Sequence, residues 1–288
     1  MAVLISTRTE SIFAFLNPLH LARTLWRHRD LIVQLTRREI EGRYRGAYLG
    51  ILWSLAHPML MLAVYTLVFG VIFQSRWPQA RSDSLADFAL ILFAGLSAYS
   101  CFSETVNRAA GSIVSVPNYV KKVIFPLEVL PVSILGAALF HMLVSVGVLL
   151  VAHLALGGGM PWTVILLPLV SLPLIFLALG IAWFVASLGV YIRDVGQAIG
   201  IVLQVMFFLT PIFYSIEIIP EPFRTLVLLN PMAPVTENFR RVLLWGQLPS
   251  FPGTLWWILG TGAVLLLGFA WFMKTRKGFA DVLCGGKG

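Results

Sequence analysis

The chain has 288 residues, of which 58% are hydrophobic and only 12% are charged, about half the charged share of an average soluble domain. The apolar residues lie in long runs, which excludes an ordinary soluble core and predicts one polytopic, all-α membrane domain. The formal charge of +8 comes from lysines and arginines that flank these runs, so it indicates membrane orientation rather than nucleic-acid binding.

The segment before the first apolar run is strongly basic. Within residues 19–45, apolar side chains recur at helical spacing on one face, at Leu21, Leu25, Ile32 and Leu35. A basic amphipathic helix beside a span usually lies in the membrane interface. Residues 1–50 are therefore predicted to be a cytoplasmic N-terminal segment that contains an interfacial helix.

Six apolar runs predict six membrane spans within residues 51–273, followed by a cytoplasmic tail at 274–288. The runs are Ile51 to Phe73, Phe88 to Cys101, Val132 to Leu156, Trp162 to Tyr191, Ile199 to Phe213, and Leu255 to Met273. The second run has fourteen residues, which is short for a span, so it either extends to Val106 or tilts in a thinned bilayer.

The segment between the fifth and sixth runs, residues 214–252, is apolar in patches and rich in proline. This composition predicts short re-entrant or external helices. A re-entrant segment would require a nearby wet cavity, because exposed backbone is not tolerated in lipid.

The distribution of basic residues tests the six-span topology. With both termini in the cytoplasm, sixteen lysines and arginines lie on the cytoplasmic side and five on the outer side. This split follows the positive-inside rule and favours an even number of spans.

The chain lacks the residue patterns of a catalytic centre. No P-loop is present, since Gly286-Lys287 is followed by Gly288, and the five histidines are scattered. Neither a catalytic residue nor a metal site is predicted. His141 and His153 are candidates for ionisable groups near the midplane, although a lone histidine in an apolar helix is more often a packing residue. The chain is therefore expected to hold no cofactor, with ATP and Mg²⁺ bound by a separate ATPase.

Four segments resemble a known family when taken in order. They are TRREIEGRYRGAYLGILWSLAHPML at 36–60, SIVSVPNYVKKVIFPLEVLPV at 112–132, YIRDV at 191–195 and LNPMAPVTENFR at 229–240. Together they resemble the membrane subunits of bacterial ABC exporters of capsular polysaccharide, O-antigen and teichoic acid. The resemblance extends over nearly the whole chain.

The resemblance implies contacts with an ATPase at two cytoplasmic segments. The first is a coupling helix that includes Asn118, Lys121, Lys122, Phe125 and Pro126; the alternative is an ordinary positively charged loop. The second, smaller contact is at Arg193 and Asp194, for which a salt bridge at a helix end is the alternative.

A basic cluster and an aromatic group are the next candidates. Arg37, Arg38, Arg43 and Arg45 either anchor the interfacial helix on lipid phosphates or also guide a lipid-linked glycan. Tyr65, Phe69 and Tyr99 either line a path for sugars or pack within the bundle.

The outer side offers a candidate gate and an aromatic belt. Asn230, Pro231, Glu237 and Arg240 either shape an external gate or form a structural turn. Trp77, Trp162, Trp256 and Trp257 lie at the ends of runs and are expected to be belt residues.

The resemblance implies the permease of an inner-membrane exporter of lipid-linked polysaccharide. Two copies would pair with two ATPase subunits, in contact with membrane lipids and with a periplasmic export partner. Two alternatives remain: an ABC exporter of lipids or drugs, and a membrane-embedded glycosyl- or acyltransferase.

Overall fold

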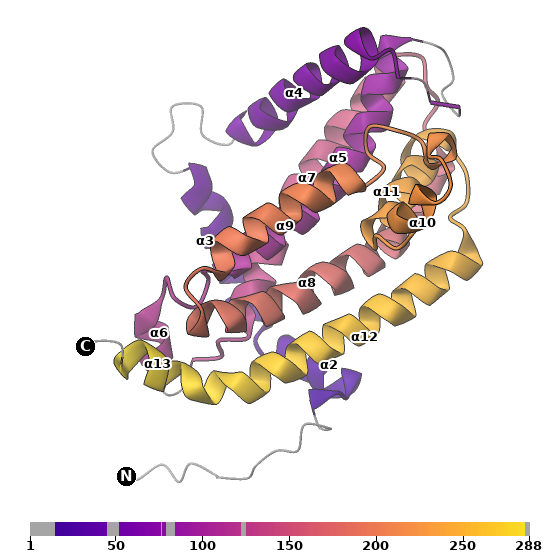
Figure 1. Cartoon of the computed structure of the whole chain (residues 1–288). Helices are drawn as coiled ribbons and strands as arrows, with labels where there is room; N and C mark the ends of the chain where they lie inside the picture. The colour runs from indigo at the N-terminus through magenta and orange to yellow at the C-terminus, as the bar shows by residue number, and fades with distance from the viewer. Residues whose placement is uncertain (1–14, 45–51, 76, 79–83, 122–124, 286–288) are drawn as a thin grey trace.

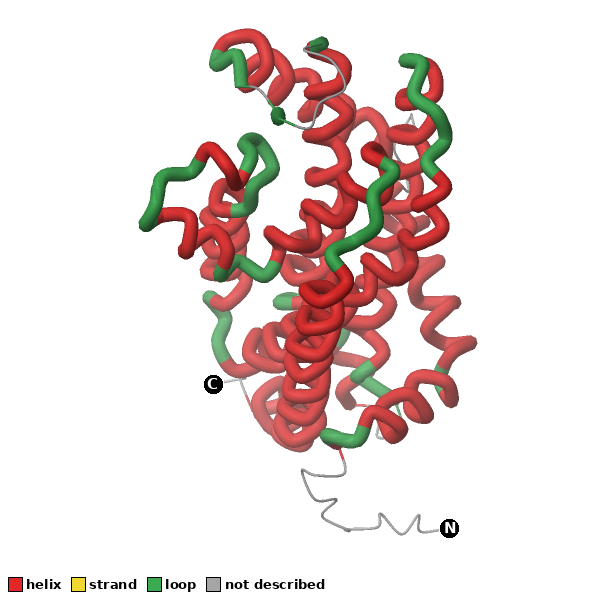
Figure 2. Tube along the Cα trace, turned by 90° about the vertical axis from the view of Figure 1, so that its right-hand side faces the viewer, coloured by secondary structure: helices red, strands yellow, loops and turns green. Residues whose placement is uncertain are grey.

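The computed structural model describes residues 15–44, 52–75, 77–78, 84–121 and 125–285. These residues are almost entirely helical, and no strand occurs among them (Figure 2). The longer helices run alongside one another, with α6 and α13 at one end of the bundle and α10 and α11 near the other (Figure 1).

The elements follow one another along the chain with short connections. They are α2 (Pro18–Arg27), α3 (Arg29–Tyr44), α4 (Trp53–Tyr65), the π-helix η2 (Thr66–Ile72), α5 (Leu85–Ala109), α6 (Pro117–Lys121), α7 (Val129–Ala155), the 3-10 helix η3 (Trp162–Leu166), α8 (Leu167–Tyr191), α9 (Val195–Leu209), η4 (Ile216–Ile218), α10 (Phe223–Leu228), α11 (Met232–Arg240), the π-helix η5 (Arg241–Trp245), α12 (Phe251–Thr275), η6 (Arg276–Gly278) and α13 (Phe279–Gly285).

Four of the described helices are long and apolar enough to cross a membrane. They comprise Leu85–Ala109, Val129–Ala155, Trp162–Tyr191 and Gly253–Leu283. Two more apolar stretches, Pro58–Ile72 and Val195–Leu209, are helical but shorter. The all-helical membrane fold is therefore confirmed at the level of four candidate spans, and the count of six remains a prediction.

The second span is longer than the fourteen-residue run suggested. Ser84 begins α5 by accepting a hydrogen bond from the backbone N–H of Asp87 at 3.1 Å, which is a typical helix N-cap. The helix then continues to Ala109 through Ser103, Glu104, Asn107 and Arg108. These polar residues shortened the apolar run without ending the helix.

The basic N-terminal segment forms two helices where the periodicity predicted one. The Asn17 side chain caps α2 by accepting from the Leu19 N–H at 2.9 Å, and α2 ends at Arg27, with His28 as its C-cap before α3 begins. Leu21 and Leu35 are buried. Helix α3 packs along α7, which brings its polar side chains to α5.

The segment between the last two apolar helices folds back onto the bundle. Helix α11 packs against α5 and α8, and most of its residues are buried. At the other side of the core, α8 and α12 lie against each other closely. A Cβ atom on Gly180 would lie 2.6 Å from the Val264 carbonyl oxygen, so the glycine allows this approach.

Candidate functional site

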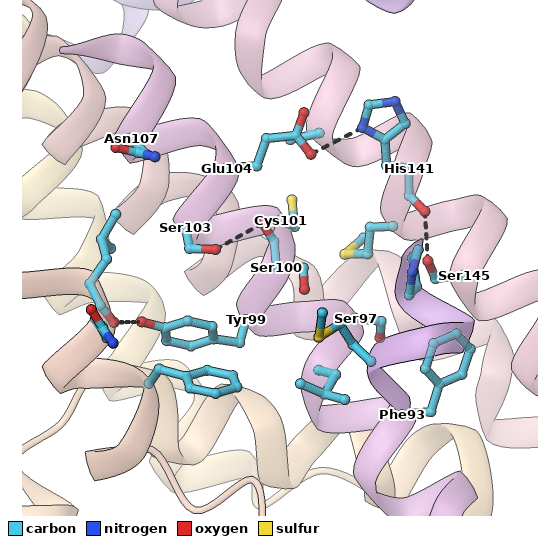
Figure 3. A pocket seen from close by; sticks show the side chains of 18 of the residues that line it. Phe93, Ser97, Tyr99, Ser100, Cys101, Ser103, Glu104, Asn107, His141 and Ser145 are labelled. Carbon is cyan, nitrogen blue, oxygen red and sulfur yellow. Dashed lines mark hydrogen bonds and ion pairs between the residues drawn. The ribbon is translucent and has the colours of Figure 1, made fainter. Parts of the chain in front are cut away.

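A cavity of about 530 Å³ opens between α4, α5, α7 and α9. Helix α5 provides much of its wall, because Phe93, Ser97, Ser100, Glu104 and Asn107 recur every three or four residues and thus share one face. Figure 3 shows these side chains together with His141 and Ser145 from α7. The wall of the cavity presents serine hydroxyl groups, and charged side chains lie at one end of it.

Aromatic rings line the side of the cavity formed by α4, α5 and α9. Phe207 of α9 lies between Tyr65 and Tyr99, with ring centroids at 5.9 and 5.2 Å, and all three residues line the cavity. The hydroxyl of Tyr99 donates to the Leu203 carbonyl, which fixes this ring. Two of the three aromatic residues named from the sequence therefore reach one cavity.

Phe69, the third aromatic residue named from the sequence, lies in the adjoining core. Its ring stacks on Phe213 at 4.4 Å, and Phe213 also contacts Tyr65 at 5.0 Å. Phe69 is not among the residues that line the cavity. It thus supports Tyr65 indirectly, whereas Phe207, which the sequence reading omitted, meets the cavity directly.

A charge network closes the opposite end of the cavity. The Arg43 guanidinium pairs with Glu104, and the Glu104 Oε2 lies 3.0 Å from His141 Nδ1. Arg108 pairs with Glu39 and lies 3.3 Å from the same carboxylate of Glu104. The Glu104 and His141 side chains are only 15% and 12% exposed, so the contact between these two groups is shielded from solvent more than a surface pair is.

This network was not found by sequence reasoning. The sequence suggested contact of Arg43 with lipid phosphates or a lipid-linked glycan, and no partner was expected for Glu39, Glu104 or Arg108. Arg43 and Glu104 are 61 residues apart, so no local pattern joins them. The available signal was the repeated Glu-x-x-x-Arg spacing at 39–43 and 104–108.

The other basic residues of the interfacial segment have separate surroundings. Arg37 is exposed and forms a 2.7 Å ion pair with Glu41, whose carboxylate raises the pKa of the guanidinium. Arg38 donates to the Tyr119 hydroxyl at 2.9 Å. Arg45 lies outside the described residues.

The expected coupling segment is partly described. In α6, Asn118 is exposed, and the Tyr119 ring stacks on Phe125 at 4.3 Å. Pro126 is half-buried. The side chain of Lys121 and all of Lys122 lie outside what the structure describes. Helix α6 also contacts α13.

The second expected coupling segment is the turn between α8 and α9. Arg193 and Asp194 are both exposed there, and no ion pair between their side chains occurs in the structure. This turn lies at the same end of the bundle as α6 (Figure 1). The two segments thus share one end, as the coupling assignment requires.

The expected outer gate is built around a buried arginine. The Arg240 side chain is fully buried and donates to the carbonyl oxygens of Pro211 at 2.7 Å, Ile212 at 3.1 Å and Ile91 at 3.3 Å. Burial lowers the pKa of this guanidinium to about 10, while Glu237 opposes the shift. Arg240 therefore ties α11 to α5 and to the end of α9.

The remaining residues that were expected on the outer side form a turn and a packing contact. Asn230 accepts from the Met232 N–H and donates to Thr210 Oγ1, both at 2.9 Å, and Pro231 follows it at the start of α11. Trp77 is buried against Arg240, so its expected place in an exposed aromatic belt is wrong. Trp162 and Trp256 are exposed.

Comparisons with known proteins cover nearly the whole chain. The family model described as "ABC-2 type transporter" matches residues 30–244. The O-antigen export system permease protein RfbA of Myxococcus xanthus is 32% identical over 91% of this chain and 99% of the relative. The corresponding protein of Klebsiella pneumoniae is 27% identical over 88% of this chain and 95% of the relative. The polysialic acid transport protein KpsM of Escherichia coli is 25% identical over 83% of this chain and 91% of the relative.

Proposed function

Because this chain belongs to the ABC-2 type transporter family, we propose that it is the transmembrane subunit of an ATP-driven exporter of O-antigen or capsular polysaccharide. Its relatives are named as permeases and transport proteins for such polymers, and they align with it nearly end to end. The energy source resides on a separate ATPase subunit, and the role of this chain is vectorial transport.

The cavity between α4, α5, α7 and α9 is the observation that carries this proposal. Aromatic faces at Tyr65, Tyr99 and Phe207 suit the C–H faces of sugar rings, and the serine hydroxyls of α5 suit their hydroxyl groups. Neither kind of contact requires one particular sugar order. Such a wall fits a long polymer that passes many similar units in succession.

The proposal places six spans across the inner membrane, with both termini in the cytoplasm. Helix α4 with η2 would be the first span and α9 the fifth. The 15 residues of α9 extend over about 22 Å, which is less than the roughly 30 Å hydrocarbon core. The buried residues at 210–213, which follow α9 directly, supply additional length.

The working assembly would contain two copies of this chain and two ATPase subunits. One copy offers a cavity open to one side, and a second copy would complete a passage for a lipid-linked glycan. Helix α6 and the turn at Arg193 and Asp194 would receive movement from the ATPases. A periplasmic protein would accept the polymer at the opposite face.

The experiment is removal of the gene from its source strain and measurement of surface polysaccharide. Loss of the surface polymer with intracellular accumulation, reversed by the wild-type gene, is expected. Unchanged polysaccharide together with altered lipid or drug resistance would favour the rival exporter class and would refute this proposal.

The ATPase contact has its own test. Lys121→Glu/Lys122→Glu should abolish co-purification with the ATPase partner, because the substitutions reverse the positive charge of the coupling segment. Arg224→Glu, in α10 at the other end, is the control and should retain the ATPase. Equal binding by both variants would contradict the coupling assignment.

A further inference from the structure

Two identical charge motifs face each other where α3 meets α5. Each helix carries a glutamate and, four residues later, an arginine: Glu39 and Arg43 on α3, Glu104 and Arg108 on α5. Within one helix this order and spacing allows an ion pair across one turn. In the structure the partners are crossed, since Arg43 pairs with Glu104 and Arg108 pairs with Glu39.

We propose that these four residues form an exchangeable latch that holds α3 against α5. In the latched state the two crossed pairs join the helices. When α3 moves away, each helix pairs its own glutamate and arginine. Arg108 already lies 3.3 Å from Glu104 in the latched state, so one of the internal pairs is partly formed.

The exchange removes the main electrostatic obstacle to opening. Separating an ordinary shielded ion pair leaves two charges without partners, which is costly. Here each helix carries one acid and one arginine, so neither helix retains an unmatched charge. The latched and open states therefore contain the same number of ion pairs. A small free-energy difference between the two states allows the contact to open and close repeatedly.

His141 determines which side of the latch moves. It extends from α7 to Glu104, with 3.0 Å between its Nδ1 and the carboxylate, and holds the α5 acid in place. The Arg43 side chain is 45% exposed against 15% for Glu104, so Arg43 is the more accessible partner and the latch assigns the movement to α3. Helix α3 is thus the element that leaves.

The latch is also the wall between two cavities. The 530 Å³ cavity of the bundle and a second cavity of about 600 Å³ beside α3 share Arg43, Glu104 and Asn107 in their linings. Opening the latch joins the two spaces. We assign the joined space to polysaccharide entry, controlled by release of Arg43 from Glu104. This assignment rests on the proposed function.

The position of α3 can be followed by a disulfide away from the charges. A Cβ atom on Gly136 of α7 would lie 3.4 Å from the Thr36 Cβ of α3, close to the separations found in disulfides. Thr36→Cys/Gly136→Cys, in a chain with Cys101→Ala and Cys284→Ala, gives a reporter. Its rate of oxidation in purified protein measures the latched state.

Charge swaps then test the latch by repulsion and rescue. Glu39→Arg/Arg43→Glu keeps an internal pair on α3 but sets like charges opposite Arg108 and Glu104. Adding Glu104→Arg/Arg108→Glu restores both crossed pairs in reversed sense. The matched control is Arg37→Glu/Glu41→Arg, which reverses an exposed pair on the same helix.

We expect the α3 swap to slow disulfide formation about tenfold or more, equivalent to at least about 1.4 kcal/mol. The fourfold swap should recover part of the rate, because it restores the crossed pairs but not the contact between His141 and Glu104. The control should stay within about twofold of the parent reporter. A fourfold variant as slow as the α3 swap, or an α3 swap as fast as the parent, would overturn the latch. Gel-filtration profiles matching the parent ensure that only folded protein is compared.

The role of opening is tested in cells with the same cysteine pair. Oxidation should stop polysaccharide delivery, and reductant should restore it; continued delivery by fully oxidised protein would overturn the gating role. The two proposals can fail separately. If the disulfide rate follows the charge swaps but neither the oxidised nor the reduced protein exports polysaccharide, the proposed function is refuted and the latch remains supported.

Discussion

The guanidinium carbon of Arg240 lies 4.3 Å from the centroid of the Trp77 ring, although 163 residues separate them along the chain. The same guanidinium donates to three carbonyl oxygens. One charged group thus satisfies backbone carbonyls where α11, α5 and the end of α9 meet. It is a structural anchor at the position where the sequence suggested a gate.

Replacing Arg240 should therefore reduce stability more than a surface substitution would. Arg240→Met fills a similar length but leaves the three carbonyls without their donor, at a cost of about 3 kcal/mol. Thermal unfolding in detergent, followed by size-exclusion chromatography, measures the change. Arg241→Met, at a half-buried neighbour, is the control. Equal midpoints for the two variants would contradict the anchor.

The contact between α8 and α12 makes a second prediction. A Cβ on Gly268 would overlap the Gly180 carbonyl oxygen, whereas a Cβ on Gly260, in the same helix, would meet nothing within 4 Å. Gly268→Ala should destabilise the fold by about 1–3 kcal/mol through overpacking. Gly260→Ala should be neutral or stabilising by up to about 1 kcal/mol because alanine favours helix. The free energy of unfolding of the two variants, measured in mixed micelles, distinguishes them. A Gly260→Ala variant less stable than Gly268→Ala would refute the close contact.

The third prediction concerns the C-terminal helix. Arg276 forms a 2.9 Å ion pair with Glu128, whose side chain is 5% exposed. Arg276→Gln should remove this ion pair and lower the free energy of unfolding by about 1–3 kcal/mol. The lower end is expected because Arg276 itself is partly exposed to solvent. Hydrogen exchange should then rise in α13, which follows directly. Lys277→Gln serves as the control, and unchanged protection of α13 in both variants would show that the tie is unimportant.

The sequence predicted the apolar helices well, since bilayer thickness sets the length of their runs. The fourth span has the bounds read from the sequence, Trp162 to Tyr191. The second was underestimated because hydropathy averages over all faces of a helix. Ser103, Glu104 and Asn107 lower that average, yet they line the cavity or meet α3 while the opposite face of α5 stays apolar and buried.

Contacts between distant residues account for most of what the sequence left undetermined. The aromatic candidates follow from the fit of ring faces to sugar C–H faces, but the cavity itself depends on how α9 lies against α5. The partner of Arg43 depends on the packing of α3 along α7. Trp77 follows an apolar run, as belt residues do, and only the position of Arg240 explains its burial.

The last prediction tests the aromatic wall with two neighbours on α9. Phe207 lines the cavity and contacts Tyr65 and Tyr99, whereas Phe208 is 54% exposed and does not line it. Phe207→Leu keeps an apolar side chain of similar reach but removes the ring face that sugars would contact.

Phe207→Leu should lower polysaccharide export about three- to tenfold, equivalent to roughly 0.6–1.4 kcal/mol for one lost ring contact. Phe208→Leu should export at the parent rate. Surface polymer after a timed induction, normalised to the amount of permease in the membrane, is the measurement. Normalisation removes any difference in folding, so equal export by the two variants would mean that the polymer does not pass the face of Phe207.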